Sequence, residues 1–436
     1  ENLFQANQGR TQTTVFDIFT LNTRLSLQLV AITASYTITI KINNTPEYLS
    51  KDILEEDFIK SFLIVYRLEL LLGSCRVDAK NRFITTPTLI QKLYTVIISM
   101  VAIAGNAFII YSFYPSVNDK TVYGLSVAAI IGHFLTYICN AIHVRFMNGA
   151  KNVEFHLKMQ KIDRLMKIDK SKPIYKMLRG ANNLSIILLF GAYVVIFIYA
   201  LIKYDYDYLM FLSVVFGQFT YIVELINCSS IVVYFVIRLK FINAIVKNHL
   251  KSNAANATDT KKVSKKYIRR LAMESHNFET SDTSVYLREL FHCFETFQEL
   301  YRFQVLFMFS LKLVIMSLIV FELLLFSIQK NKIYEMEIMS LILYTVIDIF
   351  IAIFLGYRYE MLYSEVKETK RLSIGVMAIH QTGHIREKAR TMLKMIEETP
   401  PRFSIYDMWE MNAGIFLTIF SLVTSLIVTL LQFAFL

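Results

Sequence analysis

Residues 406–436 read YDMWEMNAGIFLTIFSLVTSLIVTLLQFAFL, and this stretch decides the fold class. A short amphipathic lead is followed by an apolar run that is interrupted only near its end, by Gln432. At about 1.5 Å of rise per helical residue, about 20 apolar residues cross the hydrocarbon core of a bilayer, which is about 30 Å thick. The stretch therefore predicts a membrane-spanning helix. Because an amide that faces lipid lacks hydrogen-bond partners, we expect Gln432 to face a protein partner or a water-filled path.

The composition of the whole chain places it in the same class. Of its 436 residues, 55% are hydrophobic and 19% are charged, whereas soluble domains carry about 25% charged residues. The net charge of +11 would suit nucleic acid, but the basic residues lie between apolar runs, which is typical of cytoplasmic loops. We therefore predict a multi-pass membrane protein with no nucleic-acid partner. The four cysteines do not suggest a disulfide framework.

Seven apolar runs predict the fold class, an all-α membrane protein with seven transmembrane helices. The runs cover residues 94–113, 122–144, 184–202, 209–237, 305–328, 338–356 and 413–435. The second, fourth and sixth connections (146–183, 239–304 and 358–410) hold 9, 11 and 9 lysines and arginines, against three in the short stretches PSVNDK, DYDY and 329–337 together. Because basic loops stay in the cytoplasm, we expect the N-terminus inside and the C-terminus outside. This orientation inverts that of a G-protein-coupled receptor and argues against that class.

The long connections carry helical patterns of their own. Apolar residues recur at helical spacing in two of them, and we interpret these as cytoplasmic helical extensions bundled below the bilayer. They are Phe155, Met159, Ile162 and Met166, and Leu287, Leu290, Phe291, Phe294 and Tyr301. Residues 54–72 predict another amphipathic helix, which lies against the membrane and ends near Gly73. Arg238 and Lys240, which close the fourth run, are interpreted as ordinary cytoplasmic anchors.

An internal repeat sets the first residues of the chain apart. Residues 16–22 read FDIFTLN and residues 406–412 read YDMWEMN, with aromatic, acidic, apolar and amide positions in the same order. We hypothesise that residues 1–45 are an extra segment that resembles the last-helix exon of an adjacent duplicate. The domain organisation that follows is this segment, a cytoplasmic N-terminal helix region at 46–90 and a seven-helix domain at 91–436.

The last helix and the inverted orientation together resemble the insect gustatory receptor family, part of the insect chemoreceptor superfamily. That family carries a signature in its last helix: Thr-Tyr, five apolar residues and Gln-Phe. The corresponding positions here are Ser425, Leu426, the residues IVTLL, Gln432 and Phe433. The Gln-Phe end and its spacing are kept, whereas Ser replaces Thr conservatively and Leu replaces Tyr outright. The resemblance extends over residues 54–436.

The resemblance implies a ligand-gated, non-selective cation channel in the plasma membrane of sensory neurons. A homo- or hetero-tetramer with other gustatory receptors, surrounded by membrane lipid, would line a central pore with its last helices. A small-molecule tastant would bind in the outer half of each helix bundle. Sugar-sensing members carry a Glu directly after the Tyr of the signature, and this position is Ile427 here. A non-sugar, bitter-type tastant is therefore favoured.

Four residues of the last helix are candidates for the pore and gate: Ser425, Leu426, Gln432 and Phe433. Gln432 would offer its amide to hydrated cations, and Phe433 would narrow the path by dewetting. The alternative is that Gln432 only hydrogen-bonds a neighbouring helix, as polar residues of membrane helices commonly do.

Polar residues inside the apolar runs are the remaining candidates. For ligand binding they are His133, Tyr137, Tyr193, Gln218, Tyr221 and Glu224. Gln218, Tyr221 and Glu224 share roughly one helix face that could form a polar pocket wall, although each His or Tyr could equally be a satisfied core residue. The intramembrane charges are Lys312 and Asp348. Pairing of Lys312 with Asp348 or Glu224 would remove the penalty of an isolated buried charge.

Other functional classes leave no clear pattern in the sequence. We find no phosphate-binding loop, metal-ligand spacing or nucleophile with a neighbouring base, so we predict no enzymatic activity, no cofactor and no metal. A secondary transporter is an alternative in which the midplane charges would form the coupling site, although the two halves show no repeat. An inactive receptor paralogue is a further alternative, because Leu426 departs from the signature.

Overall fold

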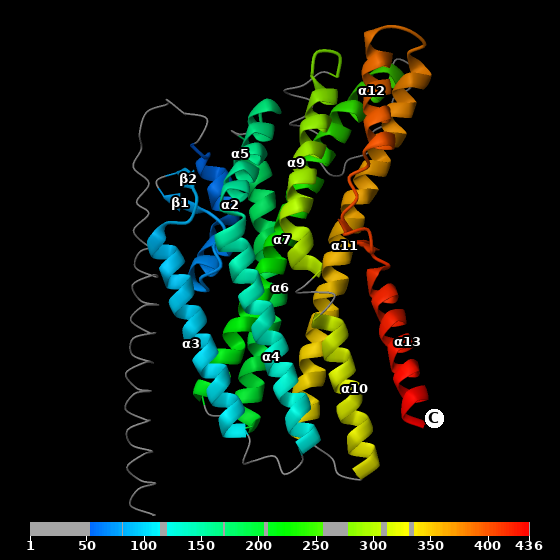
Figure 1. Ribbon diagram of the computed structural model, residues 1–436. Coiled ribbons are helices and arrows are strands. Elements are labelled where there is room, and N and C mark those ends of the chain that lie inside the picture. The colour runs from blue at the N-terminus through cyan, green and yellow to red at the C-terminus, as the bar shows by residue number, and fades with distance from the viewer. Residues whose placement is uncertain are drawn as a thin grey trace, which may run out of the picture.

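The structure is a computed structural model that describes residues 53–80, 82–113, 120–168, 171–204, 208–255, 278–306, 312–330 and 335–435. Long helices run side by side, and the two ends of the bundle differ (Figure 1). At one end, uppermost in Figure 1, short helices and a hairpin pack around the long ones. We call this the charged end. The proposed extra segment at residues 1–45 lies outside the described residues.

Each of the seven predicted apolar runs overlaps one of the long helices. These are α3 (Leu89–Phe113), α4 (Lys120–Ile142), α6 (Lys172–Tyr204), α7 (Tyr208–Ala255), α10 (Lys312–Lys330), α11 (Glu335–Ile379) and α13 (Ile415–Phe435). Within the described residues, four stretches are long and apolar enough to cross a membrane: Leu89–Phe108, Tyr123–Met147, Lys172–Val195 and Phe219–Ser252. Helices α10 and α13 contain shorter apolar stretches, Leu313–Phe326 and Leu417–Thr429. The all-α membrane fold is therefore confirmed, while the side of the membrane on which each end lies stays a prediction.

Four shorter helices build the charged end. They are α2 (Glu56–Leu71), α5 (Gly149–Leu165), α9 (Thr283–Gln304) and α12 (His384–Glu398), and a π-helical turn η2 (His143–Met147) connects α4 to α5. The apolar residues that recur at helical spacing in residues 155–166 and 287–301 are buried, as predicted. They pack in one core with the apolar face of α2.

Helix α7 is the axis of the core. Its 48 residues extend over about 72 Å, more than twice the thickness of a bilayer core, so α7 continues from the membrane region into the charged end. Its apolar window is entirely buried, whereas only 28–29% of the windows in α3, α4 and α6 are buried. Helices α3, α4, α6 and α11 all pack against it.

A glycine turn ends α2 at the predicted place. Gly73 has a φ of +70°, a conformation that costs little only without a Cβ. The N–H groups of Gly73 and Ser74 donate to the carbonyls of Leu70 (3.2 Å) and Glu69 (2.9 Å). This is the hydrogen-bond pattern of a Schellman motif, which satisfies carbonyls that the helix leaves without partners.

Two short hairpins were not predicted from the sequence. Strands β1 (Asp78–Lys80) and β2 (Phe83–Thr85) pair antiparallel beside α2 and α5, and β3 (Ser404–Ile405) pairs with β4 (Trp409–Glu410) just before α13. Strands of two or three residues are too short to produce a recognisable alternation of apolar and polar positions.

The interpretation of Arg238 as an ordinary cytoplasmic anchor is wrong. Its side chain is fully buried, and its Nε and Nη2 donate to the two carboxylate oxygens of Asp163 on α5, at 2.9 and 2.7 Å. The hydroxyls of Tyr175 and Tyr234 donate to the same carboxylate, at 2.8 and 3.0 Å. The reason is that α7 does not emerge into solvent at this level but continues through the protein core.

Candidate functional site

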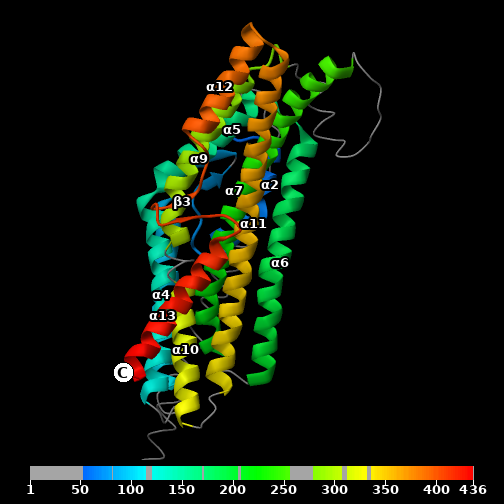
Figure 2. The same ribbon diagram turned by 90° about the vertical axis from the view of Figure 1, so that its right-hand side faces the viewer.

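The last helix, α13, lies at the edge of the bundle beside α10 and α11 (Figure 2). Ile415 and Ile419 are buried against the bundle, and Val423 packs partly against the same core. On the side turned away from them runs a row of exposed polar residues, which we call the polar stripe. Its members are Thr418, Ser421, Ser425, Thr429 and Gln432.

Helix geometry separates this stripe from the packed face. Residues spaced by three and four lie on one face of a helix with 3.6 residues per turn, whereas a step of two residues, from Ile419 to Ser421, turns about 200°. The predicted pore residues Ser425 and Gln432 are seven residues apart and share the stripe. Leu426 instead follows Ile419 by seven residues and lies on the same side of the helix, but its side chain is exposed. The side chain of Phe433 is outside the described ones.

The segment of residues 403–414 before α13, which we call the elbow, fixes the base of that helix. Phe403 is fully buried between the rings of Phe297 on α9 and Tyr359 on α11, with centroid distances of 5.5 and 5.0 Å. Its N–H donates to the Tyr363 hydroxyl at 2.9 Å, and the Gln298 side-chain amide donates to the Ser404 carbonyl at 3.2 Å. The elbow therefore connects α13 to both α9 and α11.

The elbow also touches the backbone of α11. A Cβ added at Gly356 would lie 2.7 Å from the Asn412 carbonyl oxygen, which is closer than real Cβ atoms approach. Asn412 accepts the N–H of Gly414 at 2.8 Å with its side-chain oxygen and thereby prepares the first turn of α13. Only glycine at position 356 permits this distance between α11 and the start of the last helix.

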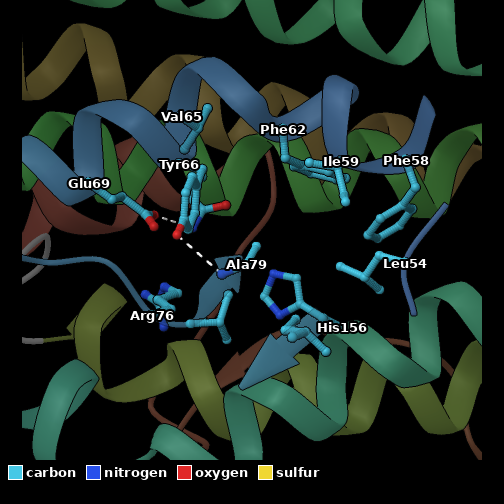
Figure 3. Close-up of a pocket in the computed structure, with 13 residues that line it drawn as sticks. Leu54, Phe58, Ile59, Phe62, Val65, Tyr66, Glu69, Arg76, Ala79 and His156 are labelled. Carbon is cyan, nitrogen blue, oxygen red and sulfur yellow. Dashed lines mark hydrogen bonds between the residues drawn. The ribbon is translucent and has the colours of Figure 1, made fainter. Parts of the chain in front are cut away.

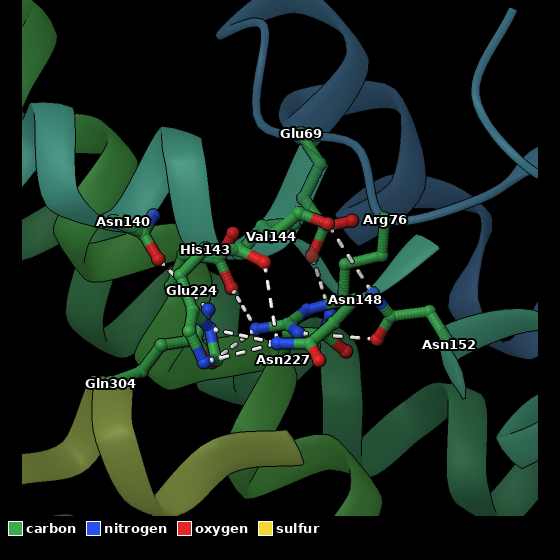
Figure 4. A network of polar contacts seen from close by, with 10 residues as sticks. All are labelled: Glu69, Arg76, Asn140, His143, Val144, Asn148, Asn152, Glu224, Asn227 and Gln304. Atoms are coloured by element: carbon green, nitrogen blue, oxygen red, sulfur yellow. Dashed lines mark hydrogen bonds and ion pairs between the residues drawn. The ribbon is translucent and has the colours of Figure 1, made fainter. Parts of the chain in front are cut away.

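A second site is a buried polar cluster where the turn after α2 meets α7 (Figure 4). Arg76 is 2% exposed, and its Nη2 bonds the Glu224 carboxylate and the Gln304 side-chain oxygen, both at 2.6 Å. Its guanidinium also lies 4.0 Å above the Tyr301 ring. Gln304 in turn donates to the Asn140 side chain at 2.8 Å. One arginine thus links α7, α9 and, through Gln304, α4.

A cavity adjoins this cluster on the side of α2 (Figure 3). It has a volume of about 50 Å³, and its polar lining comes from Tyr66, Glu69, Arg76, His156 and Asn227. The His156 Nδ1 bonds the Asn152 carbonyl at 2.8 Å. Since one water needs only about 10–15 Å³ of such space, the cavity can hold water but no larger ligand.

Three of the predicted ligand-binding tyrosines lie on or against one turn of α7, residues 217–221. A Cβ at Gly217 would lie 3.8 Å from the Cβ of Tyr137 on α4. Tyr193 of α6 packs edge-on against the Phe219 ring with a centroid distance of 5.2 Å. Tyr221 itself lies near the carboxylate of Asp348 on α11. All three tyrosines are 2% exposed.

The comparison with known families decides the class of the protein. The sequence profile of a family described as 7tm Chemosensory receptor matches residues 62–436. The chain belongs to this family. The predicted resemblance is thereby confirmed at the level of the insect chemoreceptor superfamily, and the protein is a multi-pass membrane receptor.

Among solved structures, the receptor resembles the insect olfactory receptor OR5 from Machilis hrabei in complex with eugenol. The TM-score is 0.53 at 13% sequence identity, and the match covers 86% of this chain and 100% of that chain. At this identity the likeness shows the shared fold alone. Among curated proteins, none matches the sequence.

The structure places the other predicted residues of the receptor as follows. Glu224 is not a free pocket wall residue, because its partner is Arg76, which the sequence analysis did not consider. Asp348 is buried, and the side chains of His133, Gln218 and Lys312 lie outside the described ones. The pairing expected for Lys312 therefore stays a prediction. Within the described residues, no group of three or more His, Cys, Asp or Glu side chains could hold a metal.

Sequence reasoning missed the partners of Glu224, although a signal was present. Glu69 follows Phe58, Phe62 and Val65 at helical spacing, so a carboxylate occupies the otherwise apolar face of α2. A charge on a buried face needs a compensating group nearby. Arg76, seven residues further along and also outside the seven apolar runs, was a candidate for that group, although in the structure it pairs with Glu224 instead.

Proposed function

We propose that this chemosensory receptor is a gustatory receptor that works as a ligand-gated, non-selective cation channel. Four copies, identical or with other gustatory receptors, surround a central pore in the plasma membrane of a sensory neuron. The observation that carries the proposal is the polar stripe of α13, which is exposed on a helix whose remaining residues, except Thr424, are apolar. An exposed amide such as Gln432 is costly against lipid, so the stripe favours a water-filled path shared with other copies.

The ligand is proposed to bind around residues 217–221 of α7. Tyr137 of α4 and Tyr193 of α6 pack against this turn, which carries Tyr221. Their rings and hydroxyls suit a small organic molecule with an aromatic or hydroxylated body. Ile427, where sugar-sensing members carry Glu, favours a bitter-type over a sugar tastant. That the structurally similar receptor is in complex with eugenol makes this small phenol a reasonable first probe.

The movement that opens the pore is proposed to pass through the elbow. Phe403 touches α9 and α11, and α11 also carries Asp348 beside Tyr221. A ligand that binds beside residues 217–221 of α7 and displaces α11 there therefore also displaces the base of α13. Phe433, near the end of that helix, is the proposed apolar constriction.

Accessibility of the stripe in working channels tests the proposal. The full chain behind an added Met is expressed in cultured cells and challenged with eugenol, plant alkaloids, glycosides and sugars while whole-cell current is recorded. Cysteines are introduced at Ser421→Cys and Gln432→Cys on the stripe and, as a matched control, at the exposed Phe420→Cys off the stripe. The background carries Cys139→Ser, because Cys75, Cys228 and Cys293 are buried.

A cationic methanethiosulfonate reagent is expected to reduce the ligand-evoked current of the two stripe variants and to leave Phe420→Cys unchanged. Without any ligand, mild oxidation is expected to cross-link copies of Gln432→Cys but not of Phe420→Cys. If the reagent leaves the ligand-evoked current unchanged at both stripe positions, the assignment of α13 to the pore would be contradicted. Accumulation of labelled ligand without current would favour the transporter alternative.

A further inference from the structure

The carboxyl group of Glu69 is buried and forms no ion pair in the part of the chain that the structure describes. It lies on the last turn of α2, is 3% exposed and accepts a hydrogen bond from the Asn227 side-chain amide of α7. Within the described residues, no basic nitrogen lies close enough to form an ion pair with it; the nearby Arg76 is engaged by Glu224. A carboxylate left in this state would carry a large desolvation penalty.

A guanidinium with unused donors lies at the same end of α2. Arg145 of η2 is 1% exposed, and its Nε donates to the Gly73 carbonyl at 3.3 Å and to the Thr95 hydroxyl at 3.0 Å. Its Nη1 and Nη2 are buried and have no hydrogen-bond partner in the described part of the chain. The C-terminal end of α2 compensates part of the charge, because a helix C-terminus carries a partial negative charge. The N–H groups of both Nη atoms nevertheless lack an acceptor.

Several titratable and polar groups face Glu69 from the elements around it. They are Glu224 and Asn227 of α7, Cys75 and Arg76 of the turn, Arg145 of η2, His156 of α5, Tyr301 of α9 and Tyr66 of α2 itself. Burial and then the Glu224 carboxylate raise the pKa of Glu69, and these effects exceed the opposing effects of Arg76, Asn227 and Arg145. The resulting pKa of about 8 leaves Glu69 mostly protonated at neutral pH.

We propose that Glu69 is a proton-operated switch at the crossing of α2 and α7, with two alternative partners. With its proton, the carboxyl remains on the Asn227 amide. When the proton leaves, the carboxylate turns to the two free Nη atoms of Arg145, and an ion pair replaces the amide contact. The water-sized cavity lined by Glu69 and His156 gives the departing proton a path to solvent (Figure 3).

The switch lies beside a chain of aromatic contacts that leads to the elbow. Arg76 stacks on Tyr301, Tyr301 lies 4.8 Å from Phe297, and Phe297 lies 5.5 Å from Phe403. A change of charge at Glu69 alters the field at Arg76 and so reaches the segment that carries α13. The pH on the charged side of the receptor would thereby bias the position of the last helix, whether or not α13 lines a pore.

Infrared difference spectroscopy tests the titration directly and needs no ligand. The purified full-length receptor in lipid nanodiscs is titrated from about pH 6 to about pH 10, a range that brackets the expected midpoint. We expect a carboxylic-acid C=O band to disappear with a midpoint near pH 8, and this band to be absent in Glu69→Gln. Glu365→Gln, which alters a carboxylate facing Lys240 at 3.7 Å, is the matched control and should retain the band.

The thermal unfolding midpoint gives a second measurement with a defined sign. The unfolded chain releases the proton near the ordinary pKa of 4.5, whereas the folded state keeps it to about pH 8. Stability is therefore highest below the unfolded value and is lost as the pH rises to about 8, after which it levels off. Glu69→Gln is expected to remove this decline, because a neutral amide cannot ionise.

The partner exchange is tested separately from the titration. Arg145→Gln removes the cation that favours the ionised form, so the midpoint of the infrared band should rise by about one pH unit. If Arg145→Gln does not fold, Asn227→Leu provides the other arm, because loss of the amide that holds the protonated carboxyl in the proposed exchange should lower the midpoint. An unchanged midpoint in the variant that folds, or a band that persists in Glu69→Gln, would overturn the proposal.

Discussion

The charged end and the last helix treat their polar side chains in opposite ways. At the charged end, Asp163 and Arg238 are 0% exposed and every carboxylate oxygen of the pair accepts a hydrogen bond. On α13, Ser425 and Gln432 are exposed on a helix that packs along one narrow face. The first region buries its charged pairs inside a single chain, and the second leaves its polar side chains exposed.

This contrast distinguishes the part of the receptor that is held together by contacts within one chain from the part that is not. A buried ion pair specifies one arrangement of helices, because any displacement leaves a charge without its partner. The hydroxyls of Thr418 and Thr429 donate to carbonyls four residues earlier in the chain, so within the described residues the polar stripe fixes no contact between helices and gains further partners from water or from other copies. The charged end therefore acts as the rigid frame, and α13 is the element left free to assemble and move.

The largest effect is expected from breaking the frame at Asp163. In Asp163→Asn, Arg238 loses its counter-charge in a fully buried position, which should cost about 3–5 kcal/mol of unfolding free energy. The measurement is the yield of folded receptor and its thermal unfolding midpoint in detergent. The double variant Asp163→Leu with Arg238→Met is the control, because an apolar replacement of both partners should recover much of the stability. Equal losses in both variants would contradict the buried-charge explanation.

A smaller loss is expected at the junction between the two regions. Phe403→Ala removes a fully buried ring, and such truncations cost about 3–5 kcal/mol, with the lower part of the range expected where an elbow can partly collapse. We expect cross-linking at Gln432→Cys to weaken as well, because the base of α13 is no longer fixed. Phe420→Ala, which truncates an exposed ring of α13, should leave the unfolding midpoint nearly unchanged. A normal cross-linking pattern in Phe403→Ala would show that the elbow does not position the helix.

Gly356→Ala should have an intermediate effect on stability and a specific effect on α13. Its new Cβ would meet the Asn412 carbonyl oxygen at 2.7 Å, and overpacking of this kind costs about 1–3 kcal/mol. Because the atom that must move belongs to the backbone, we expect the start of α13 to shift. Gly124→Ala, at a site with nothing within 4 Å of the new Cβ, is the matched control. Both the unfolding midpoint and the reactivity of Ser421→Cys report the change.

Much of this frame could be predicted from the sequence. Apolar runs and helical spacing identified the seven long helices, and Phe155, Met159, Leu287 and Leu290 were placed correctly in the core. These patterns are local, since they depend on the spacing of residues along one helix. The end of α2 at Gly73 was also predictable, because a glycine directly after a helical pattern is a local stop signal.

The partners of charged residues could not be predicted in this way. Arg76 meets Glu224 across 148 residues of sequence, and Arg238 meets Asp163 across 75. Such pairs depend on how helices pack, which no local spacing records. The polar stripe lies between these cases: its spacing is in the sequence, but its position opposite the packed face of α13 required the structure.

The smallest effect is expected at an exposed ion pair whose distance is close to that of the buried Asp163–Arg238 pair. Lys161 of α5 lies 2.9 Å from Glu289 of α9, close to the 2.7 Å between Arg238 and Asp163, but its side chain is 66% exposed. Exposed pairs contribute about 0–1 kcal/mol, because water solvates both ions when they separate. Lys161→Ala should therefore change the unfolding midpoint by little more than the error of measurement, and the remaining difference should vanish at high salt. A loss as large as that of Asp163→Asn would mean that the charged end depends on all its ion pairs, and burial would no longer explain why Asp163 and Arg238 hold the frame together.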